Sequence, residues 1–199
     1  PPFRASAMQR AWLCPPAPWR EAAMPETPAG PAAAEGTMLH AAVVRAYRHG
    51  DFSGLEDEQR GAVRACVRFL ESIVQDALPE GLIFEEPTEV LGRDLDPIID
   101  REVTPDVVVF KPGGLAVVVD WKFGRAEPQF EAGRDLQLLT YAIAVRNGYE
   151  GISRVHVYRF HPRLWDEHRE TCVAYEGDDD YWTDREQVLR RIVADSTPD

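Results

Sequence analysis

Three residues that could do chemistry together lie close in sequence, on two apolar runs joined by a short turn within residues 103–124. Asp106 precedes the run VVVF, Asp120 ends the run LAVVVD, and Lys122 follows two residues later. Runs this rich in valine are typical of strands buried on both faces. An unpaired carboxylate there is costly or shifts its pKa. We therefore expect the two acids and the lysine to neutralise one another or to hold a cation.

The turn at residues 112–114, Pro-Gly-Gly, decides whether these side chains meet. A three-residue hairpin loop is typically a type I turn followed by a glycine with positive φ, here Gly114. That turn places Asp106 opposite Asp120, and the period of two along a strand places Lys122 on the same face. A two-residue turn would shift the register by one residue and send the acids to opposite faces.

This cluster has the composition that metal-dependent phosphodiester hydrolysis needs. A cation neutralises developing charge and lowers the pKa of the attacking water. Mg²⁺ prefers oxygen ligands, commonly one or two carboxylates with water, which Asp106 and Asp120 could supply. A lysine at the position of Lys122 could orient the water and stabilise the charged transition state. The alternative is a structural ion pair between Asp120 and Lys122, and the apolar run at 115–119 favours the site over it.

Length and composition indicate one globular domain. The chain has 199 residues with 44% hydrophobic and 28% charged residues, which is ordinary for a globular protein. We expect one domain over residues 1–199. It would comprise an N-terminal helix and proline-rich loop over 1–32, a core over 33–175 and a C-terminal helix over 176–199.

The net charge of −12 argues against extended, non-specific binding of duplex DNA by this chain alone. The acidity is uneven, because residues 51–100 carry 13 acids and four Lys or Arg, whereas residues 101–170 carry ten of each. The segment with the proposed site is therefore neutral. A tight hold on a polyanion would have to come from local arginines or from a protein partner.

The sequence also limits compartment and cofactors. No apolar stretch approaches the roughly 20 residues of a membrane span, and no signal peptide is evident, so we expect a cytoplasmic protein without membrane contact. The cysteines Cys14, Cys66 and Cys172 are odd in number and far apart. That spacing argues against a disulfide framework, a zinc site or a four-cysteine iron–sulfur cluster.

Periodicity and breaker residues predict an α/β fold with a central mixed β-sheet flanked by helices. Helices are expected over residues 5–12 (with Ser6 as N-cap), 33–48, 57–77, 131–146 and 181–194. Strands are expected over 82–91, on both sides of the 112–114 turn, and over 152–160 and 171–175. Three acids in the segment between strand 82–91 and the hairpin, Asp94, Asp96 and Asp100, are better explained as a solvated turn than as metal ligands.

Two of these helices carry polar residues that could reach the hairpin. His40 lies at the edge of the apolar stripe of helix 33–48, where a lone histidine usually has a structural role. Gln137 and Tyr141 are four residues apart in helix 131–146 and share one face.

Five short motifs occur in order over residues 6–160. They are Ser6…Arg10-x-Trp12-x-Cys14-Pro15, Glu35-Gly36-Thr37-x-x-His40, Thr104-Pro105-Asp106, Asp120-Trp121-Lys122 and Gln137-x-x-x-Tyr141. Together they resemble the PD-(D/E)xK nuclease superfamily, in particular the phage-associated members of its RecB-like branch. The resemblance implies a restriction-endonuclease-like core and a Mg²⁺- or Mn²⁺-dependent deoxyribonuclease, exonuclease-like, that processes phage or mobile-element DNA in a bacterial or phage-infected cell.

The resemblance also implies a role for each matched residue. His40, Asp106 and Asp120 would bind the metal, with the Trp121 carbonyl as a further ligand, and Lys122 would be the catalytic lysine. Gln137 and Tyr141 would contact the DNA backbone or support the site, and Glu35 would assist from outside it.

One departure from the family bears on the cofactor. Members with an iron–sulfur cluster carry four cysteines, one early and three late, so we expect no cluster here. The expected partner is DNA, as single strands or duplex ends, with a protein partner possible. The alternative function is a catalytically weak nucleic-acid-binding or partner-docking module that retains the nuclease fold.

Overall fold

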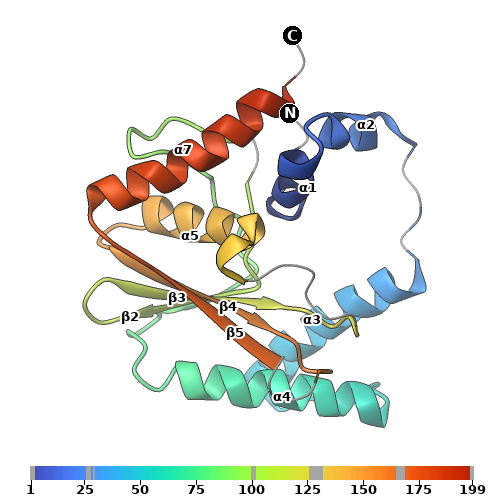
Figure 1. The fold of residues 1–199 in the computed structure, drawn as a ribbon. Helices are drawn as coiled ribbons and strands as arrows, with labels where there is room; N and C mark the ends of the chain where they lie inside the picture. The colour runs from blue at the N-terminus through green and yellow to red at the C-terminus, as the bar shows by residue number, and fades with distance from the viewer. Residues whose placement is uncertain are drawn as a thin grey trace.

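A five-stranded mixed sheet forms the centre of the protein. The computed structural model describes residues 3–25, 28, 30–99, 102–125, 132–164 and 169–197. The strands lie in the order β1-β2-β3-β4-β5, antiparallel except for the parallel pair β3–β4. Their bounds are Leu82–Phe84, Val107–Lys111, Leu115–Trp121, Arg154–Phe160 and Glu170–Glu176. With the helices that flank the sheet, this confirms the predicted fold class (Figure 1).

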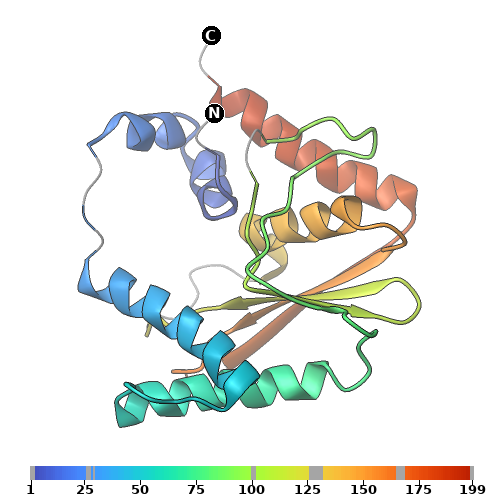
Figure 2. The same cartoon turned by 180° about the vertical axis from the view of Figure 1, so that it is seen from behind.

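Helices cover both faces of the sheet. In the first half of the chain they are η1 Ala5–Ala7, α1 Met8–Leu13, α2 Ala17–Ala23, α3 Pro31–His49 and α4 Asp57–Ile73. In the second half they are η2 Ala132–Arg134, α5 Leu136–Gly148 and α7 Asp179–Ser196. Helices α3 and α4 pack on one face, and α1, α5 and α7 lie on the other (Figures 1 and 2). Within the described residues, no helix has both the length and the apolar character that a membrane crossing requires.

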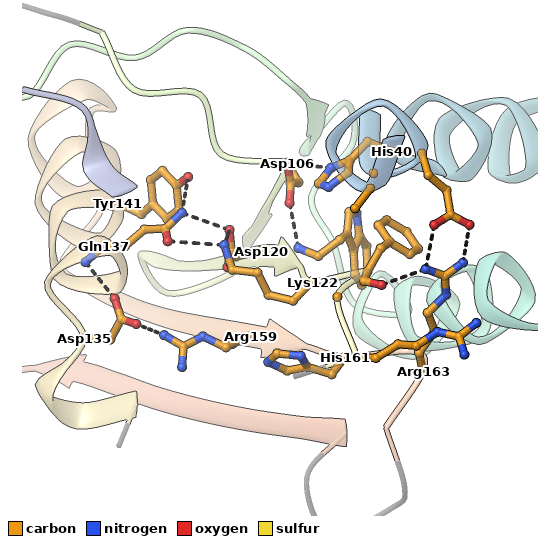
Figure 3. Close-up of a pocket in the computed structure, with 17 residues that line it drawn as sticks. His40, Asp106, Asp120, Lys122, Asp135, Gln137, Tyr141, Arg159, His161 and Arg163 are labelled. Atoms are coloured by element: carbon orange, nitrogen blue, oxygen red, sulfur yellow. Dashed lines mark hydrogen bonds and ion pairs between the residues drawn. The ribbon is translucent and has the colours of Figure 1, made fainter. Parts of the chain in front are cut away.

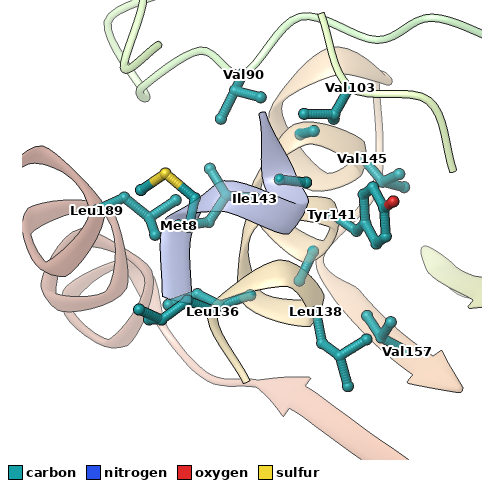
Figure 4. Packing of buried hydrophobic residues seen from close by; sticks show 14 of the residues in the cluster. Met8, Val90, Val103, Leu136, Leu138, Tyr141, Ile143, Val145, Val157 and Leu189 are labelled. Carbon is teal, nitrogen blue, oxygen red and sulfur yellow. The ribbon is translucent and has the colours of Figure 1, made fainter. Parts of the chain in front are cut away.

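The alternation of side chains along the strands produces two cores. In β3, Ala116 and Val118 pack toward α5, whereas Val117 and Val119 pack toward α3 and α4. Figure 4 shows the first core, where α5 packs against Met8 of α1 and side chains from the sheet and α7. Asp120 continues the α5 face of β3, so an acid stands where the apolar pattern calls for a core residue.

The hairpin has the expected register but a different turn. Lys111 pairs with Leu115, and Val107 with Val119 as the last pair, so the same register places Asp106 opposite Asp120 just beyond the ladder. The φ angles of Gly113 and Gly114 are +77° and +73°. The positive φ at Gly113 is that of a type II turn, so the expectation of a type I turn is wrong. Only a glycine adopts these two conformations without strain, and the three-residue loop length is what preserves the register.

The predicted strand over residues 82–91 is wrong beyond β1. Glu85 adopts a positive φ of +49°, which ends regular pairing after Phe84. The backbone then forms the isolated bridges Thr88–Val103 and Leu91–Pro97 instead of a continuous ladder. In the turn that follows, Asp96 forms an ion pair with Arg190 at 2.8 Å, whereas Asp100 lies outside the described residues.

Several helix boundaries also differ from the prediction. The first helix begins as η1 with Arg4 as N-cap, so the expected Ser6 cap is wrong. The proline-rich loop contains α2, and α3 begins at Pro31, because proline is well tolerated in the first turn of a helix. Helix α4 ends at Ile73, four residues before the predicted end.

The last two helices begin at aspartate caps that differ from the predicted starts. Asp135 caps α5, because its side chain accepts from the backbone N–H groups of Gln137 and Leu138. The predicted start at Glu131 lies outside the described residues. Helix α7 begins after Asp178, whose side chain accepts from the Tyr181 N–H. Val188, expected in its apolar stripe, is 40% exposed.

Candidate active site

The hairpin acids and lysine line one cavity of about 870 Å³ at the ends of β2, β3 and β4. Figure 3 shows residues from α3, the hairpin, β4 and α5 pointing into it. Lys122 follows β3 directly, and its backbone N–H donates to the Phe160 carbonyl at 2.9 Å, which continues the β3–β4 pairing. Its Nζ lies 2.8 Å from Asp120 Oδ2 and donates to Oδ1 at 3.0 Å. The D-x-K triplet therefore forms an ion pair inside a cavity rather than on an open surface.

Asp106 is held by two groups from different elements. Its Oδ2 accepts from the backbone N–H of Trp121 at 2.6 Å, and its Oδ1 lies 3.0 Å from His40 Nδ1. The His40 ring also packs edge-on against Phe123, with centroids 5.2 Å apart. His40 thus comes from α3 to the first hairpin acid. The indole of Trp121 packs in the core on the α4 face, and only its backbone belongs to the site.

Gln137 and Tyr141 of α5 complete the surroundings of Asp120 and Lys122. Lys122 Nζ donates to Gln137 Oε1 at 3.2 Å. Gln137 Nε2 donates to Asp120 Oδ1 at 3.3 Å and to the Tyr141 hydroxyl at 3.0 Å. The amide therefore accepts from the cation and donates to the anion of the same ion pair, which fixes both side chains relative to α5.

Glu35 lies at the rim of the cavity and binds Arg163. Arg163 Nη2 donates to Glu35 Oε1 at 2.7 Å, and Gln59 Nε2 donates to the same oxygen at 2.9 Å. The hydrogen bond from Arg163, followed by that from Gln59, lowers the pKa of Glu35 to about 2. Arg163 also donates to the Phe123 carbonyl at 2.9 Å. Arg163 therefore joins the segment after β4 both to Glu35 of α3 and to the chain that follows Lys122.

Burial and neighbouring charges shift the pKa values of two central groups in the same direction. Burial raises the pKa of Asp120, and the charge of Asp106 raises it further, against the opposing effect of Lys122. Burial alone would lower the pKa of His40. The hydrogen bond to Asp106 and the charges of Asp106, Asp120 and Glu85 outweigh it, so the pKa of His40 is raised.

Five polar residues that line the cavity are not indicated by the sequence analysis: Arg125, Asp135, Arg159, His161 and Arg163. Arg159 pairs in register with Asp120 and forms an ion pair with Asp135, the N-cap of α5. A signal existed in β4, because Val155, Val157 and Arg159 alternate on one buried face and the third is charged. His161 continues that face beyond the end of the strand. It is 5% exposed, and burial, followed by the charges of Arg159 and Lys122, lowers its pKa to about 4.

The chemical types of the donor groups at the centre of the cavity suit a hard divalent cation. Two carboxylates and an imidazole converge there, and among the described residues Oδ2 of the buried Asp120 faces only the Lys122 ammonium group, 2.8 Å away. In the part of the chain that the structure describes, however, no three His, Cys, Asp or Glu side chains are arranged so that they could hold a metal ion. His40 and Lys122 instead pair with the two carboxylates. Metal binding would require these pairs to rearrange.

One protein-family model matches half of the chain. The family model described as the PD-(D/E)XK nuclease superfamily matches residues 98–197, which include both hairpin acids, Lys122, Gln137 and Tyr141. No curated protein matches in sequence.

Two solved structures share a weak overall likeness. One is an alkaline exonuclease (LHK-Exo) from Laribacter hongkongensis, with 15% identity and a TM-score of 0.42, covering 98% of this chain and 87% of that one. The other is LHK-Exo in complex with dAMP, with 16% identity, the same TM-score and the same coverage.

Proposed function

We propose a specific activity for this chain, which belongs to the PD-(D/E)XK nuclease superfamily: hydrolysis of DNA phosphodiester bonds, dependent on Mg²⁺ or Mn²⁺. One observation carries the proposal. Lys122 Nζ lies between the carboxylate of Asp120 and the amide of Gln137, inside a cavity that also holds the His40–Asp106 pair. This is the set of groups that phosphodiester hydrolysis needs, brought together from three separate segments.

Asp106, Asp120 and His40 would hold the cation, with the Trp121 carbonyl as a further donor. The bound cation would neutralise charge on the phosphate and lower the pKa of the attacking water. Lys122 would then orient that water and stabilise the negative charge that develops on the phosphate. The position of Lys122 suits this role, because its ion pair with Asp120 keeps the ammonium group beside a proposed metal ligand.

The remaining residues of the proposed site act through others. Gln137 positions Lys122 and Asp120, and Tyr141 positions Gln137 through its hydroxyl. Glu35 holds Arg163 and so supports the wall of the cavity. More specifically, we propose that the chain acts as an exonuclease on phage or mobile-element DNA, as in the RecB-like branch.

The test is cleavage of end-labelled single- and double-stranded DNA by the full chain, with Mg²⁺ or Mn²⁺ and with a chelator. Lys122→Ala is expected to lower the rate at least about a hundredfold. Lys111→Ala is the matched control, because this lysine of the same hairpin pairs with Asp76 outside the cavity. Circular DNA and RNA of the same sequence distinguish exonuclease from endonuclease action and DNA from RNA specificity. Equal cleavage by wild type and Lys122→Ala would refute the proposal.

A second candidate is a partner-docking module that keeps the nuclease fold without the activity. The net charge of −12 favours it, and so does the engagement of both carboxylates by His40 and Lys122. Calorimetry with Mn²⁺ separates the two. Binding that is lost in Asp106→Ala supports the nuclease, whereas absence of binding in the wild type supports the docking module.

A further inference from the structure

Strand β4 places two buried nitrogen donors beside the proposed catalytic pair. Arg159 is the register partner of Asp120, and adjacent strands lie about 4.8 Å apart. His161 follows two residues later, next to Lys122, whose N–H donates to the intervening Phe160 carbonyl. Alternation keeps Arg159 and His161 on the face of the sheet that carries Asp120 and Lys122. Figure 3 shows both side chains along the cavity floor.

Both side chains carry polar atoms that nothing in the described structure satisfies. Arg159 and His161 are each 5% exposed. Three of their nitrogen atoms have no hydrogen-bond partner among the described residues: both ring nitrogens of His161 and the Nε of Arg159. A buried polar group without a hydrogen bond loses its hydration uncompensated, so such groups usually meet a partner. Because both line the cavity, a bound molecule can supply that partner.

The charges around His161 decide the sign of that molecule. Arg159 and Lys122 are the charged groups that act on the ring, and both are cationic, which disfavours a metal ion or a second cation at this imidazole. Asp135 already occupies Nη2 of Arg159 but leaves Nε free to donate. The two donors therefore suit an anion with several oxygen acceptors. A phosphate group meets that requirement, because arginine and imidazole N–H groups form charge-assisted hydrogen bonds to its oxygens.

We propose that Arg159 and His161 form a phosphate-binding subsite that positions a nucleic-acid phosphate neighbouring the scissile one. The inference rests on the proposed nuclease function and adds a specificity determinant to it. The bound group is either a terminal phosphate or an internal phosphodiester of the same strand. The ion pair with Asp135 holds the Arg159 side chain in place. His161, the next residue on the same face, would donate to oxygens of the same phosphate.

The test compares two histidines of one segment. His161→Gln removes the imidazole from the cavity and keeps a hydrogen-bonding side chain. His156→Gln is the matched control, because His156 lies on the opposite face of β4 and pairs with Glu176. Binding of labelled single-stranded oligonucleotides to each full chain is measured by fluorescence anisotropy in chelator, so that no cleavage occurs. Steady-state cleavage with Mg²⁺ or Mn²⁺ is measured alongside.

His161→Gln is expected to weaken oligonucleotide binding about tenfold and to raise KM with little change in kcat. His156→Gln should change neither. Three oligonucleotides distinguish a terminal phosphate from an internal phosphodiester as the bound group. They carry a 5′-phosphate, a 3′-phosphate or hydroxyls at both ends. A defect confined to one phosphorylated end identifies a terminal phosphate, and an equal defect on all three identifies an internal phosphodiester.

A second readout does not depend on any variant. The imidazole resonances of His161 in the wild-type chain should shift when the phosphorylated oligonucleotide is added, and those of His156 should not. Wild-type binding and unshifted His161 resonances, or equal binding by His161→Gln, would overturn the subsite even if cleavage is normal. If the wild type binds and shifts His161 but does not cleave, the subsite stands and the nuclease proposal fails.

Discussion

Asp106 and Trp121 are joined across the hairpin by a hydrogen bond from the Trp121 backbone N–H to Asp106 Oδ2, with N and O 2.6 Å apart. The last paired residues of the β2–β3 ladder on this side are Val107 and Val119. The carboxylate therefore takes the place of the next ladder acceptor. This bond turns Oδ1 toward His40, so the geometry of the site depends on the register that the turn sets.

The first prediction concerns that turn. Gly114→Ala is expected to destabilise the protein by about 1–3 kcal/mol and to lower cleavage. Gly114 has a φ of +73°, and a Cβ there would lie 2.6 Å from the Gly151 carbonyl oxygen, which is backbone and cannot move aside. Thermal unfolding and the rate on end-labelled DNA measure the two effects.

Gly61→Ala provides the control for this glycine substitution. Gly61 lies within α4, and a Cβ there meets nothing within 4 Å. Alanine should raise the free energy of unfolding by up to about 1 kcal/mol, because it favours the helix. An equal loss of stability in both variants would show that the turn conformation is not the cause.

The second prediction concerns His40. His40→Ala is expected to weaken Mn²⁺ binding at least about tenfold, because it removes both a donor and the group that holds Asp106 Oδ1. Isothermal titration calorimetry measures the affinity. His49→Ala, in the last turn of the same helix, should bind Mn²⁺ as the wild type does. An unchanged affinity in His40→Ala would remove His40 from the proposed ligands and leave it with a structural role.

Much of the hairpin could be predicted from sequence, because its geometry is local. Three loop residues fix the register, and the period of two then places Asp106, Asp120 and Lys122 on one face. The same local reasoning failed for the turn type and for the segment after Phe84. Glu85 adopts a positive φ that residue preferences do not favour, so the local sequence does not predict that the strand ends there.

The rest of the site depends on contacts between distant segments. His40 meets Asp106 because α3 packs beside the end of the hairpin, and the family motif, not periodicity, predicts a ligand at this position. Arg159 and His161 reach the cavity because β4 runs parallel to β3, a pairing that no turn specifies. The alternation of Val155, Val157 and Arg159 marked a charge on a buried face, but it did not show which site that face belongs to.

The third prediction separates two residues of α5. Gln137→Ala is expected to lower kcat by about ten- to a hundredfold with little change in KM, because Lys122 and Asp120 both lose a partner. Tyr141→Phe removes only the acceptor for Gln137 Nε2 and should lower kcat a few-fold, about the effect of one hydrogen bond. Steady-state cleavage over a range of oligonucleotide concentrations gives kcat and KM for both variants. A larger loss in Tyr141→Phe than in Gln137→Ala would indicate that Tyr141 acts on the DNA directly.

The fourth prediction uses the pKa of Glu35, which is about 2 in the folded protein against an ordinary value of 4.5. A lowered pKa means that the ionised form is favoured by folding. The resulting stability is fully present above about pH 4.5 and is lost as the pH falls toward about 2. Glu35→Gln should therefore lower Tm at neutral pH, and its difference from wild type should shrink as the pH falls below about 4.5.

Thermal unfolding across a pH series measures this difference for Glu35→Gln. Glu71→Gln, at an exposed position on α4, controls for the loss of a carboxylate and should follow the wild-type curve throughout. The Arg163 guanidinium is the main cause of the shift, so Arg163→Gln should reproduce the pH dependence of Glu35→Gln. A Tm difference that stays constant with pH would mean that Glu35 stabilises the wall of the cavity by packing and not by its charge.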